Sequence, residues 1–416
     1  MSHQPSTERK SVWRVLRSIR LDNLFVLLVG ASAVLGAVIY AIRGNGSFSE
    51  SFFIGGGDFF MDFFNSIRDA SQGSGVYSER GVIYPPMANL IFLFLSRFTP
   101  TGYHDSSFPL RRLWVYYDAC LLLVFVTIVV CTVLLTATLF WTNKTSSLRK
   151  RATLSCAVLV STPILYLMER GNILLLTLVA LMIYASTYES KSKRAREIGL
   201  LALAFAFSIK LYPVVFGWLL LVDKRYKDAA RCALYGVAML ILPSFFFGGP
   251  VFCFTQCLHN IFNFSTGSGN TITKVMAYVG ISKEIQEAVN LLAYLWVLIC
   301  GICFALSAFL PQEKRWRSWL LGCVTILCVP SLTGIYSWAF FLIPLLCLFE
   351  IRKPNRSQKK SAVLMTLPFL HLPFRFSLHV PASIVLVYLT TAVLSIYAVA
   401  GTAKELMIYF RKQKSL

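Results

Sequence analysis

The acidic side chains that could act on a substrate cluster in one short segment. Asp58, Asp62 and Asp69 follow three consecutive glycines in GGGDFFMDFFNSIRDA (55–70). In a helix these three positions share one face, and the neighbouring phenylalanines supply an apolar one. A carboxylate next to apolar groups can serve as a general base, because desolvation raises its pKa toward a useful range. Asp58 has a second interpretation, as the N-cap of the helix, and the local sequence leaves both open.

Two cations are candidates for binding an anion. Arg170 lies in Glu-Arg-Gly-Asn (169–172), and Lys210 lies in Lys-Leu-Tyr-Pro (210–213), each between apolar stretches. A cation that faces a cavity inside a membrane marks a functional position, and phosphate is a natural counter-ion for it. The alternative is that each side chain extends to the lipid headgroups.

Several polar side chains could contact a sugar. Tyr84 precedes two prolines, and Asn172 follows Arg170. His259, Asn263 and Asn270 lie in a segment rich in amides and hydroxyls, which suit sugar hydroxyls but also describe any solvated loop. Tyr-Pro-Pro alone is equally typical of a rigid turn.

A metal site is not expected. Cys253, Cys257 and His259 form a C-x3-C-x-H cluster, which lacks the paired spacing of a zinc site. The other cysteines fall within apolar segments, where a free thiol behaves as a small hydrophobe. The sequence therefore predicts neither a metal centre nor a disulfide framework.

The elements that position these residues must lie in lipid. Of the 416 residues 56% are hydrophobic and only 14% are charged, whereas soluble chains carry about 25% charged residues. Residues 23–42 contain no charge over roughly 20 residues, which is enough to cross a bilayer. The net charge of +21 comes from short basic runs between apolar segments. Such runs are typical of cytoplasmic loops rather than of nucleic-acid binding.

We therefore expect an all-α, multi-pass protein of the cell membrane with about twelve transmembrane or half-membrane helices in one domain. Its parts are a first span (22–42), an outer loop with interfacial helices (43–112), core spans (113–247), a second outer loop (248–287) and C-terminal spans (288–401). The distribution of lysine and arginine places both termini in the cytoplasm, and makes the short apolar run 86–98 interfacial or re-entrant rather than a crossing.

Two pairs of apolar segments are too short for full crossings. One pair meets at 169–172 and the other at 210–213, where Pro213 disfavours a continuous helix. Non-helical backbone at membrane depth is tolerated only against protein or a water-filled cavity. We expect two half-depth hairpins whose tips, with Arg170 and Lys210, face a cavity on the non-cytoplasmic side.

These motifs resemble those of glycosyltransferase family 87, a family of polyprenyl-phosphate-dependent enzymes of the GT-C type. The first match is GGGDFFMDFF (55–64) followed by YSERGVIYPPMANLIFLFL (77–95). RGNILLLTLVALMIYAS (170–186) and the segment REIGLLALAFAFSIKLYPVVFGWLLLVDKRYKDAARC (196–232) are similar to two further motifs of that family, in the same order.

The resemblance implies an inverting, metal-independent transfer without a cofactor. A hexose or pentose, mannose or a similar sugar, would move from a polyprenyl-phosphate donor to a hydroxyl of a glycan or glycolipid on the non-cytoplasmic face. Asp58 would be the general base, and Lys210 and Arg170 would hold the donor phosphate. The chain departs from the family at Asp62, where an aromatic residue is common. Asp62 is then either a second, acceptor-binding carboxylate or the base itself.

Two other classes of function compete with this one. A secondary transporter or a flippase of lipid-linked sugars would also combine many spans with broken helices and buried cations. Such proteins usually show an internal repeat and ionisable groups in mid-span, whereas here no repeat is visible and the acids crowd an outer loop. A purely structural membrane partner would leave Arg170 and Lys210 without a role.

Overall fold

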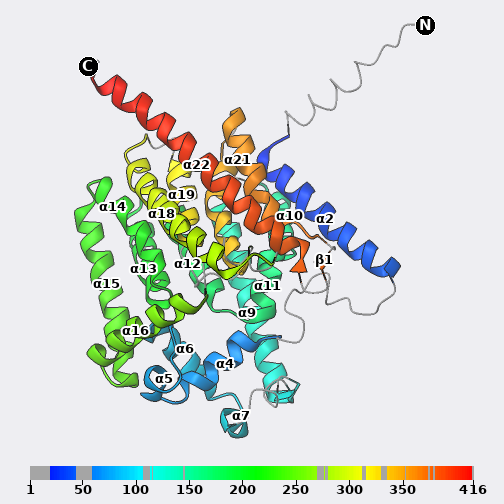
Figure 1. Ribbon diagram of the computed structural model, residues 1–416, viewed down its shortest axis with the longest axis vertical. Helices are drawn as coiled ribbons and strands as arrows, with labels where there is room; N and C mark the ends of the chain where they lie inside the picture. Colours follow the sequence, from blue (N-terminus) through cyan, green and yellow to red (C-terminus); the bar gives the residue numbers. More distant parts are fainter. Residues whose placement is uncertain are drawn as a thin grey trace.

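The computed structural model is an assembly of helices (Figure 1). It describes residues 19–43, 59–105, 113–114, 116–143, 146–268, 276, 280–311, 315–328, 335–351, 353–372, 375–377 and 380–414. The strands among these residues are β1 (Arg375–Ser377) and β2 (Val380–Pro381), which form one short antiparallel pair. The all-α class predicted from the sequence is confirmed.

The helices follow one another along the chain with short connections. The first are α2 (Leu21–Arg43), α4 (Met61–Ala70), α5 (Gly75–Ser78), α6 (Pro86–Ser96), α7 (Thr101–Asp105) and α9 (Asp118–Thr142). The next are α10 (Leu148–Leu159), α11 (Thr162–Arg170), α12 (Leu174–Thr187), α13 (Lys193–Ile209), η1 (Tyr212–Gly217), α14 (Trp218–Val222), α15 (Tyr226–Ser244), η2 (Phe245–Phe247) and α16 (Pro250–Ser268). The last are α18 (Lys283–Ser307), α19 (Arg315–Cys328), η4 (Ile335–Phe341), α20 (Leu342–Phe349), α21 (Arg356–Thr366), η5 (Leu367–Phe369) and α22 (Ala382–Lys414). Helices α4 to α7 gather at the end of the molecule opposite to the C-terminus of α22 (Figure 1).

Five helical stretches among the described residues are long and apolar enough to cross a membrane. They are Leu21–Ile39, Asp118–Thr142, Tyr226–Phe247, Lys283–Ser307 and Leu389–Arg411. A sixth span results if α10 and α11, which meet at an angle of 59°, cross together. Helices α6 and α12 are apolar but shorter. Embedding in a membrane is thereby supported, while the count of about twelve transmembrane or half-membrane helices stays a prediction.

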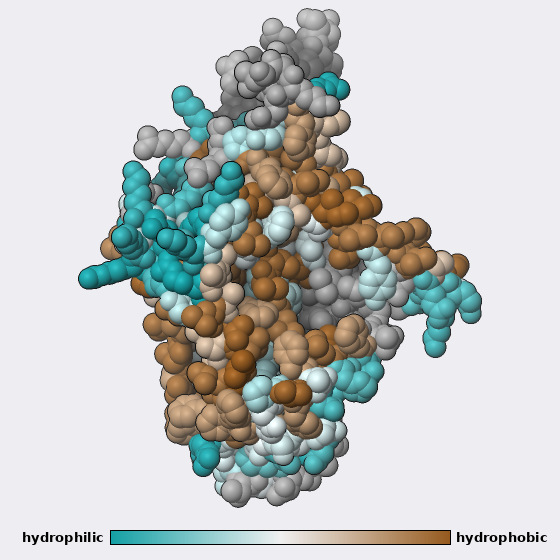
Figure 2. All heavy atoms as spheres, turned by 90° about the vertical axis from the view of Figure 1, so that its left-hand side faces the viewer, coloured by the Kyte–Doolittle hydropathy of each residue, from teal (hydrophilic) through white to brown (hydrophobic). Residues whose placement is uncertain are grey.

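The outer faces of the long helices are apolar. Figure 2 shows a broad hydrophobic area over the middle of one face, with hydrophilic residues gathered at the upper left, at the right edge and near the bottom. On α15 the side chains of Leu234 and Leu242 are each 65% exposed, and on α9 Phe125 is 64% exposed. A continuous apolar surface of this kind needs lipid as its solvent.

Two apolar segments of the sequence are each divided between two helices in the structure. Residues 152–167 are shared between α10 and α11, because Pro163 occupies the first turn of α11 and cannot continue the helix before it. The segment 362–374 leaves its α-helix at Thr366, where Pro368 opens η5. Neither segment forms one uninterrupted helix.

A buried histidine holds the bend between α10 and α11. The side chain of His371 is 4% exposed, and its Nε2 donates to the carbonyl of Val160 at the break. Its backbone N–H donates to Ser32 Oγ at 3.1 Å. The hydroxyl of Thr162, at the start of α11, donates to the carbonyl of Leu370 at 2.8 Å. These bonds satisfy groups that the broken helix leaves without a helical partner, and so they fix the direction of α11.

We expect His371→Leu to destabilise the protein by about 1–3 kcal/mol, because it leaves the Val160 carbonyl buried and unsatisfied. The apparent Tm of purified protein in detergent measures this effect. His371→Gln keeps a donor and should lose less. His259→Leu, at an exposed histidine, is the matched control and should leave Tm unchanged. Equal losses in the His371→Leu and His259→Leu variants would contradict the assignment.

The helix of the acidic segment begins later than expected. Helix α4 starts at Met61 and its N-cap is Phe60, so the interpretation of Asp58 as the N-cap of this helix is wrong. Asp58 itself lies outside the described residues. The side chains of Phe63 and Phe64 are buried, and α4 packs against α6 and α11. The phenylalanines therefore fill the protein interior rather than facing lipid.

The second outer segment also differs from its prediction as an irregular loop. Residues 250–268 form helix α16, and the loop prediction is wrong for them. The periodicity that produces this helix places Cys253 and Cys257 on one buried face, where they pack with Tyr77 and Phe247. Among the described residues no group of three or more histidine, cysteine, aspartate or glutamate side chains could hold a metal ion.

Candidate functional site

An unusual backbone conformation fixes the start of α4. Phe60 has a φ of 58°, in the left-handed region that non-glycine residues rarely adopt. Its backbone N–H donates to the carbonyl of Glu169 at 2.6 Å, and its ring packs against that of Phe63 at a centroid distance of 5.3 Å. The surrounding contacts hold this strained residue in place. The first turn of α4 is thereby attached to the end of α11.

Asp62 and Arg170, 108 positions apart in the sequence, form an ion pair in that first turn. Arg170 donates from Nε to Asp62 Oδ1 at 3.1 Å and also from Nη2 to the same oxygen. Asn172 Nδ2 donates to Asp62 Oδ2 at 2.9 Å, while Asn172 Oδ1 accepts from the backbone N–H of Leu174 at 3.0 Å. Both oxygens of Asp62 are therefore engaged by the end of α11 and the start of α12.

Gly171 makes this approach possible. It has a φ of 61° as the C-cap of α11. A Cβ at this position would lie 2.7 Å from Phe63 Cβ and 2.9 Å from Phe60 Cδ1. Only glycine tolerates both the backbone conformation and the space. Arg170 and Asn172 can therefore both bond to Asp62, because the residue between them, Gly171, has no side chain to keep α4 away.

Lys210 lies beside this network at the end of α13. Its Nζ is 4.0 Å from the centroid of the Tyr84 ring, a cation–π distance. Burial lowers the pKa of Lys210 to about 8, and the carboxylate of Asp62 opposes that shift. Lys210 forms no ion pair with any residue that the structure describes. It is therefore a cation in the site with no carboxylate bonded to it.

Tyrosines surround the cations and the carboxylate. The hydroxyl of Tyr84 interacts with Asn172 and Ser66, and burial raises its pKa, so it remains protonated. Tyr336, from η4, lies within electrostatic range of Asp62 and Tyr84. The sequence predicts Tyr84 but gives no sign of Tyr336, because no nearby motif marks it.

Two more tyrosines of this group were missed, although each had a signal. Tyr166 lies one helical turn before Arg170, and its ring packs against that of Tyr336 at 5.7 Å. Tyr212 follows Lys210 by two residues and interacts electrostatically with Tyr84. Their spacing from the two predicted cations could have identified them.

An apolar cavity adjoins the polar network. It has a volume of about 210 Å³ and lies between α4, α6, α9, α11 and α12. Asn172 and Gly171 form part of its wall, next to Phe60 and Phe63. On α9 the cavity is lined by Val126 and Val130, which are 47% and 49% exposed. The cavity thus extends from the polar network to the apolar outer surface of the molecule.

Of the other predicted site residues, His259 and Asn263 are described and do not contact this network. Asp58 and Asn270 lie outside the described residues. His259 and Asn263 are exposed on α16 and lie 2.9 Å apart, Nε2 to Nδ2. Asn260 faces inward instead, donating to the carbonyl of Tyr77 at 3.0 Å. Helical spacing, which a loop prediction ignores, decides which asparagine turns inward.

Comparison with known proteins identifies the chemistry of this fold. The model of glycosyltransferase family 87 matches residues 83–332, more than half of the chain. The chain belongs to glycosyltransferase family 87. No match is found among the curated proteins. The protein is therefore a glycosyltransferase, and its donor and acceptor are a sugar-bearing molecule and a sugar-accepting one.

The matched region contains most of the network. Tyr84, Arg170, Asn172 and Lys210 lie within it, whereas the acidic segment with Asp62 precedes it. Membership of the family assigns the protein to glycosyl transfer rather than to transport. The ion pair between Asp62 and Arg170 therefore joins the acidic segment, which precedes the matched region, to the Arg-Gly-Asn motif inside that region.

Replacing Gly171 tests the junction between α4 and α11. We expect Gly171→Ala to lower the apparent Tm and to reduce glycosyl transfer at least tenfold, because the added Cβ collides with Phe63 and moves Arg170 away from Asp62. Gly30→Ala on α2 is the matched control, since a Cβ there would meet nothing within 4 Å. Retention of full activity by Gly171→Ala would show that the junction is dispensable.

The pH dependence of transfer tests Lys210. If the protonated amine is required, the rate falls as pH rises through about 8, the pKa that burial imposes on this lysine. The guanidinium of Lys210→Arg stays charged, so this variant should keep its rate to higher pH. Initial rates at saturating donor, measured from pH 6 to 10, give both profiles. An identical alkaline decline in the two proteins would exclude Lys210 as its cause.

Proposed function

We propose that this glycosyltransferase moves a hexose or pentose, mannose or a similar sugar, from a polyprenyl-phosphate donor to a hydroxyl of a glycan or glycolipid. The observation that carries the proposal is the position of the polar network. Asn172, which is bonded to Asp62, also lines an apolar cavity that extends to the outer surface, and Arg170 and Lys210 both interact with Asp62. A donor with a charged head and a hydrocarbon tail matches that combination of a cationic and an apolar site.

The two ends of the donor have separate places in this proposal. The isoprenoid chain enters the cavity between α6, α9 and α12 and replaces lipid there, since both are apolar. The phosphate binds Lys210, which forms no ion pair among the described residues. Arg170 is already bonded to Asp62, so a contact between Arg170 and the phosphate comes second.

The reaction is a single displacement. The acceptor oxygen attacks the anomeric carbon and forms a new C–O bond, while the bond from that carbon to the phosphate oxygen breaks. The bonding electrons leave with the polyprenyl phosphate, and Lys210 stabilises the growing negative charge. A carboxylate takes the proton of the acceptor hydroxyl. Attack opposite to the leaving phosphate inverts the anomeric configuration, and this scheme uses no metal ion or cofactor.

The contacts of Asp62 help to divide the carboxylate roles. Its two oxygens accept hydrogen bonds from Arg170 and Asn172, so Asp62 serves to position α4 against α11. We assign the general base to Asp58, which precedes Asp62 by four residues and stands at the leading position of the family motif. Asp62 then contributes through the geometry of the network.

The cellular setting belongs to the same proposal and rests on the sequence. We propose a multi-pass protein of the cell membrane with both termini in the cytoplasm. The whole chain forms one domain, and transfer takes place on the non-cytoplasmic face. His259, Asn263 and Asn270 remain candidate acceptor contacts by their composition alone.

Transfer of radiolabelled sugar by the purified protein tests the proposal. A panel of polyprenyl-phosphate sugars, with mannose among the sugars, is offered together with a lipid-linked glycan acceptor. We expect Asp58→Asn to reduce the rate by about 10²–10⁴-fold, the usual contribution of a general base. Asp118→Asn, an exposed acid at the start of α9, should retain the rate.

The same assay separates a base from a positioning residue. If Asp62 acts through Arg170, the losses in Asp62→Asn and Arg170→Gln should not add in the double variant. Additive losses would give Asp62 a role independent of Arg170. Full activity of Asp58→Asn would remove the base assignment, and absence of transfer from every donor would remove the donor class.

A further inference from the structure

A second cavity lies at the other end of the molecule from the candidate site. Its volume is about 580 Å³, within the range of roughly 300–1,000 Å³ that small-molecule sites occupy. Helix α12 begins next to Asn172 and ends at this cavity, and its 14 residues span about 20 Å. The cavity is therefore separate from the network around Asp62, and the proposed transfer reaction does not use it.

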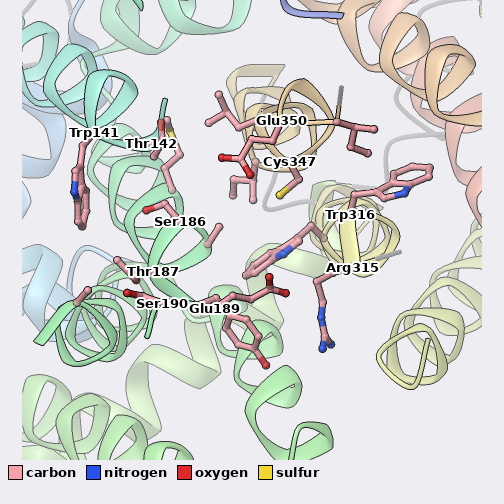
Figure 3. A pocket seen from close by; sticks show the side chains of 18 residues that line it. Trp141, Thr142, Ser186, Thr187, Glu189, Ser190, Arg315, Trp316, Cys347 and Glu350 are labelled. Carbon is pink, nitrogen blue, oxygen red and sulfur yellow. The ribbon is translucent and has the colours of Figure 1, made fainter. Parts of the chain in front are cut away.

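Two carboxylates point into the cavity. Figure 3 shows Glu189, in the turn after α12, and Glu350, the C-cap of α20, projecting toward its middle, and both residues are exposed on the open side of the cavity. Neither forms an ion pair or a side-chain hydrogen bond with the residues that the structure describes. Desolvation raises the pKa of Glu350, and the negative charge of Glu189 raises it further. The two acids thus repel each other across the cavity.

The arginine in the wall of the cavity does not neutralise them. Arg315 Nη2 donates to both oxygens of Asp223, at 2.7 and 2.9 Å. Tyr188 donates its hydroxyl to the same carboxylate at 2.7 Å. Figure 3 shows the guanidinium of Arg315 pointing away from the two glutamates. Its charge is therefore committed to Asp223, outside the cavity.

Helix ends of both polarities meet at the cavity. The C-termini of α9, α12 and α20 lie there, and so do the first turns of α13, with Ala195, and of α19, with Arg315 and Trp316. A helix C-terminus carries a partial charge of about −0.5 from its unsatisfied carbonyls. Glu350 is itself the C-cap of α20, where a carboxylate is electrostatically unfavourable. A bound cation would relieve both the repulsion between the acids and this mismatch.

The remaining wall combines aromatic, aliphatic and hydroxyl side chains. The indole rings of Trp141, Trp316 and Trp319 line the cavity. Indole faces attract organic cations, and aromatic walls combined with carboxylates are the usual surroundings of bound ammonium groups. A strongly hydrated metal ion would instead require more oxygen ligands than two carboxylates provide.

We propose that this cavity is a second binding site, specific for an ammonium group carried by an organic cation. The ammonium lies between Glu189 and Glu350, and its apolar portion lies against the tryptophans. Either a free polyamine or the headgroup of an amine-bearing phospholipid supplies that chemistry. The site is distinct from the proposed active site, and its occupancy is independent of sugar transfer.

Binding of defined cations to the full-length protein in detergent tests this inference. Isothermal titration with spermidine and with tetramethylammonium should show binding. The double variant Glu189→Gln with Glu350→Gln should weaken it at least tenfold. The matched control, Glu79→Gln with Glu284→Gln, removes the same charge away from the cavity and should bind as the wild type does. Equal affinity of the wild type and the Glu189/Glu350 variant would overturn the proposal, as would binding of Mg²⁺ in place of the organic cations.

A second arm separates the two sources of the ammonium group. The protein is reconstituted in phosphatidylglycerol nanodiscs with or without phosphatidylethanolamine, and its apparent Tm is measured. A rise with phosphatidylethanolamine that the Glu189/Glu350 variant lacks supports a lipid headgroup as the ligand. Spermidine binding without that rise supports a free polyamine. Absence of both effects in the wild type would refute the site.

Discussion

The contact of Asp62 with Arg170 and Asn172 holds the candidate site together. Charges removed from water cost several kcal/mol each unless they are paired and hydrogen-bonded, so neither side chain could stay in this position without the other. The pair fixes the first turn of α4 on the end of α11. Phe60 in its left-handed conformation and Gly171 without a side chain permit the approach. The tyrosines and Lys210 are then arranged around a carboxylate whose position is already determined.

Broken helices are what bring these side chains together. Arg170 ends α11, and Lys210 caps the C-terminus of α13. At a helix C-terminus the dipole favours a cation, so both positions are electrostatically matched before any ligand binds. The backbone groups freed at the bend before α11 are satisfied by His371 and Thr162. At the bend before α11 the freed backbone groups keep hydrogen-bond partners. The helix ends at Arg170 and Lys210 place two charges inside an apolar molecule.

The opposite end of the molecule shows the reverse arrangement. There Glu189 and Glu350 stand at helix C-termini, where the dipole disfavours an anion. One end of α12 thus lies near two cations that stand at the C-termini of α11 and α13. The other end lies near two carboxylates that stand at helix C-termini, in the wall of a large cavity. The molecule accordingly has two chemically different cavities, one next to a network that contains two cations and one with two carboxylates in its wall.

The sequence by itself determined the solvent of the protein and most of its helices. Apolar composition and uncharged stretches such as residues 23–42 depend only on local hydropathy, so they specify lipid embedding and helical structure without knowledge of contacts. The breaks at Gly171 and Pro213 were also local, and they correctly marked where α11 and α13 end. Family motifs then supplied the reaction class.

Only the tertiary structure decided what those features contact. The partner of Arg170 is 108 residues away, and no local pattern marks Asp62 rather than Glu169 as its carboxylate. Burial of Phe63 and Phe64 against α6 and α11, instead of against lipid, depends equally on long-range packing. Helix α16 also depends on the tertiary structure, because its rotation against the neighbouring segments decides that Asn260 points toward the Tyr77 carbonyl. Local propensity fixes where a helix runs, but pairing of charges and burial of faces depend on which segments meet in space.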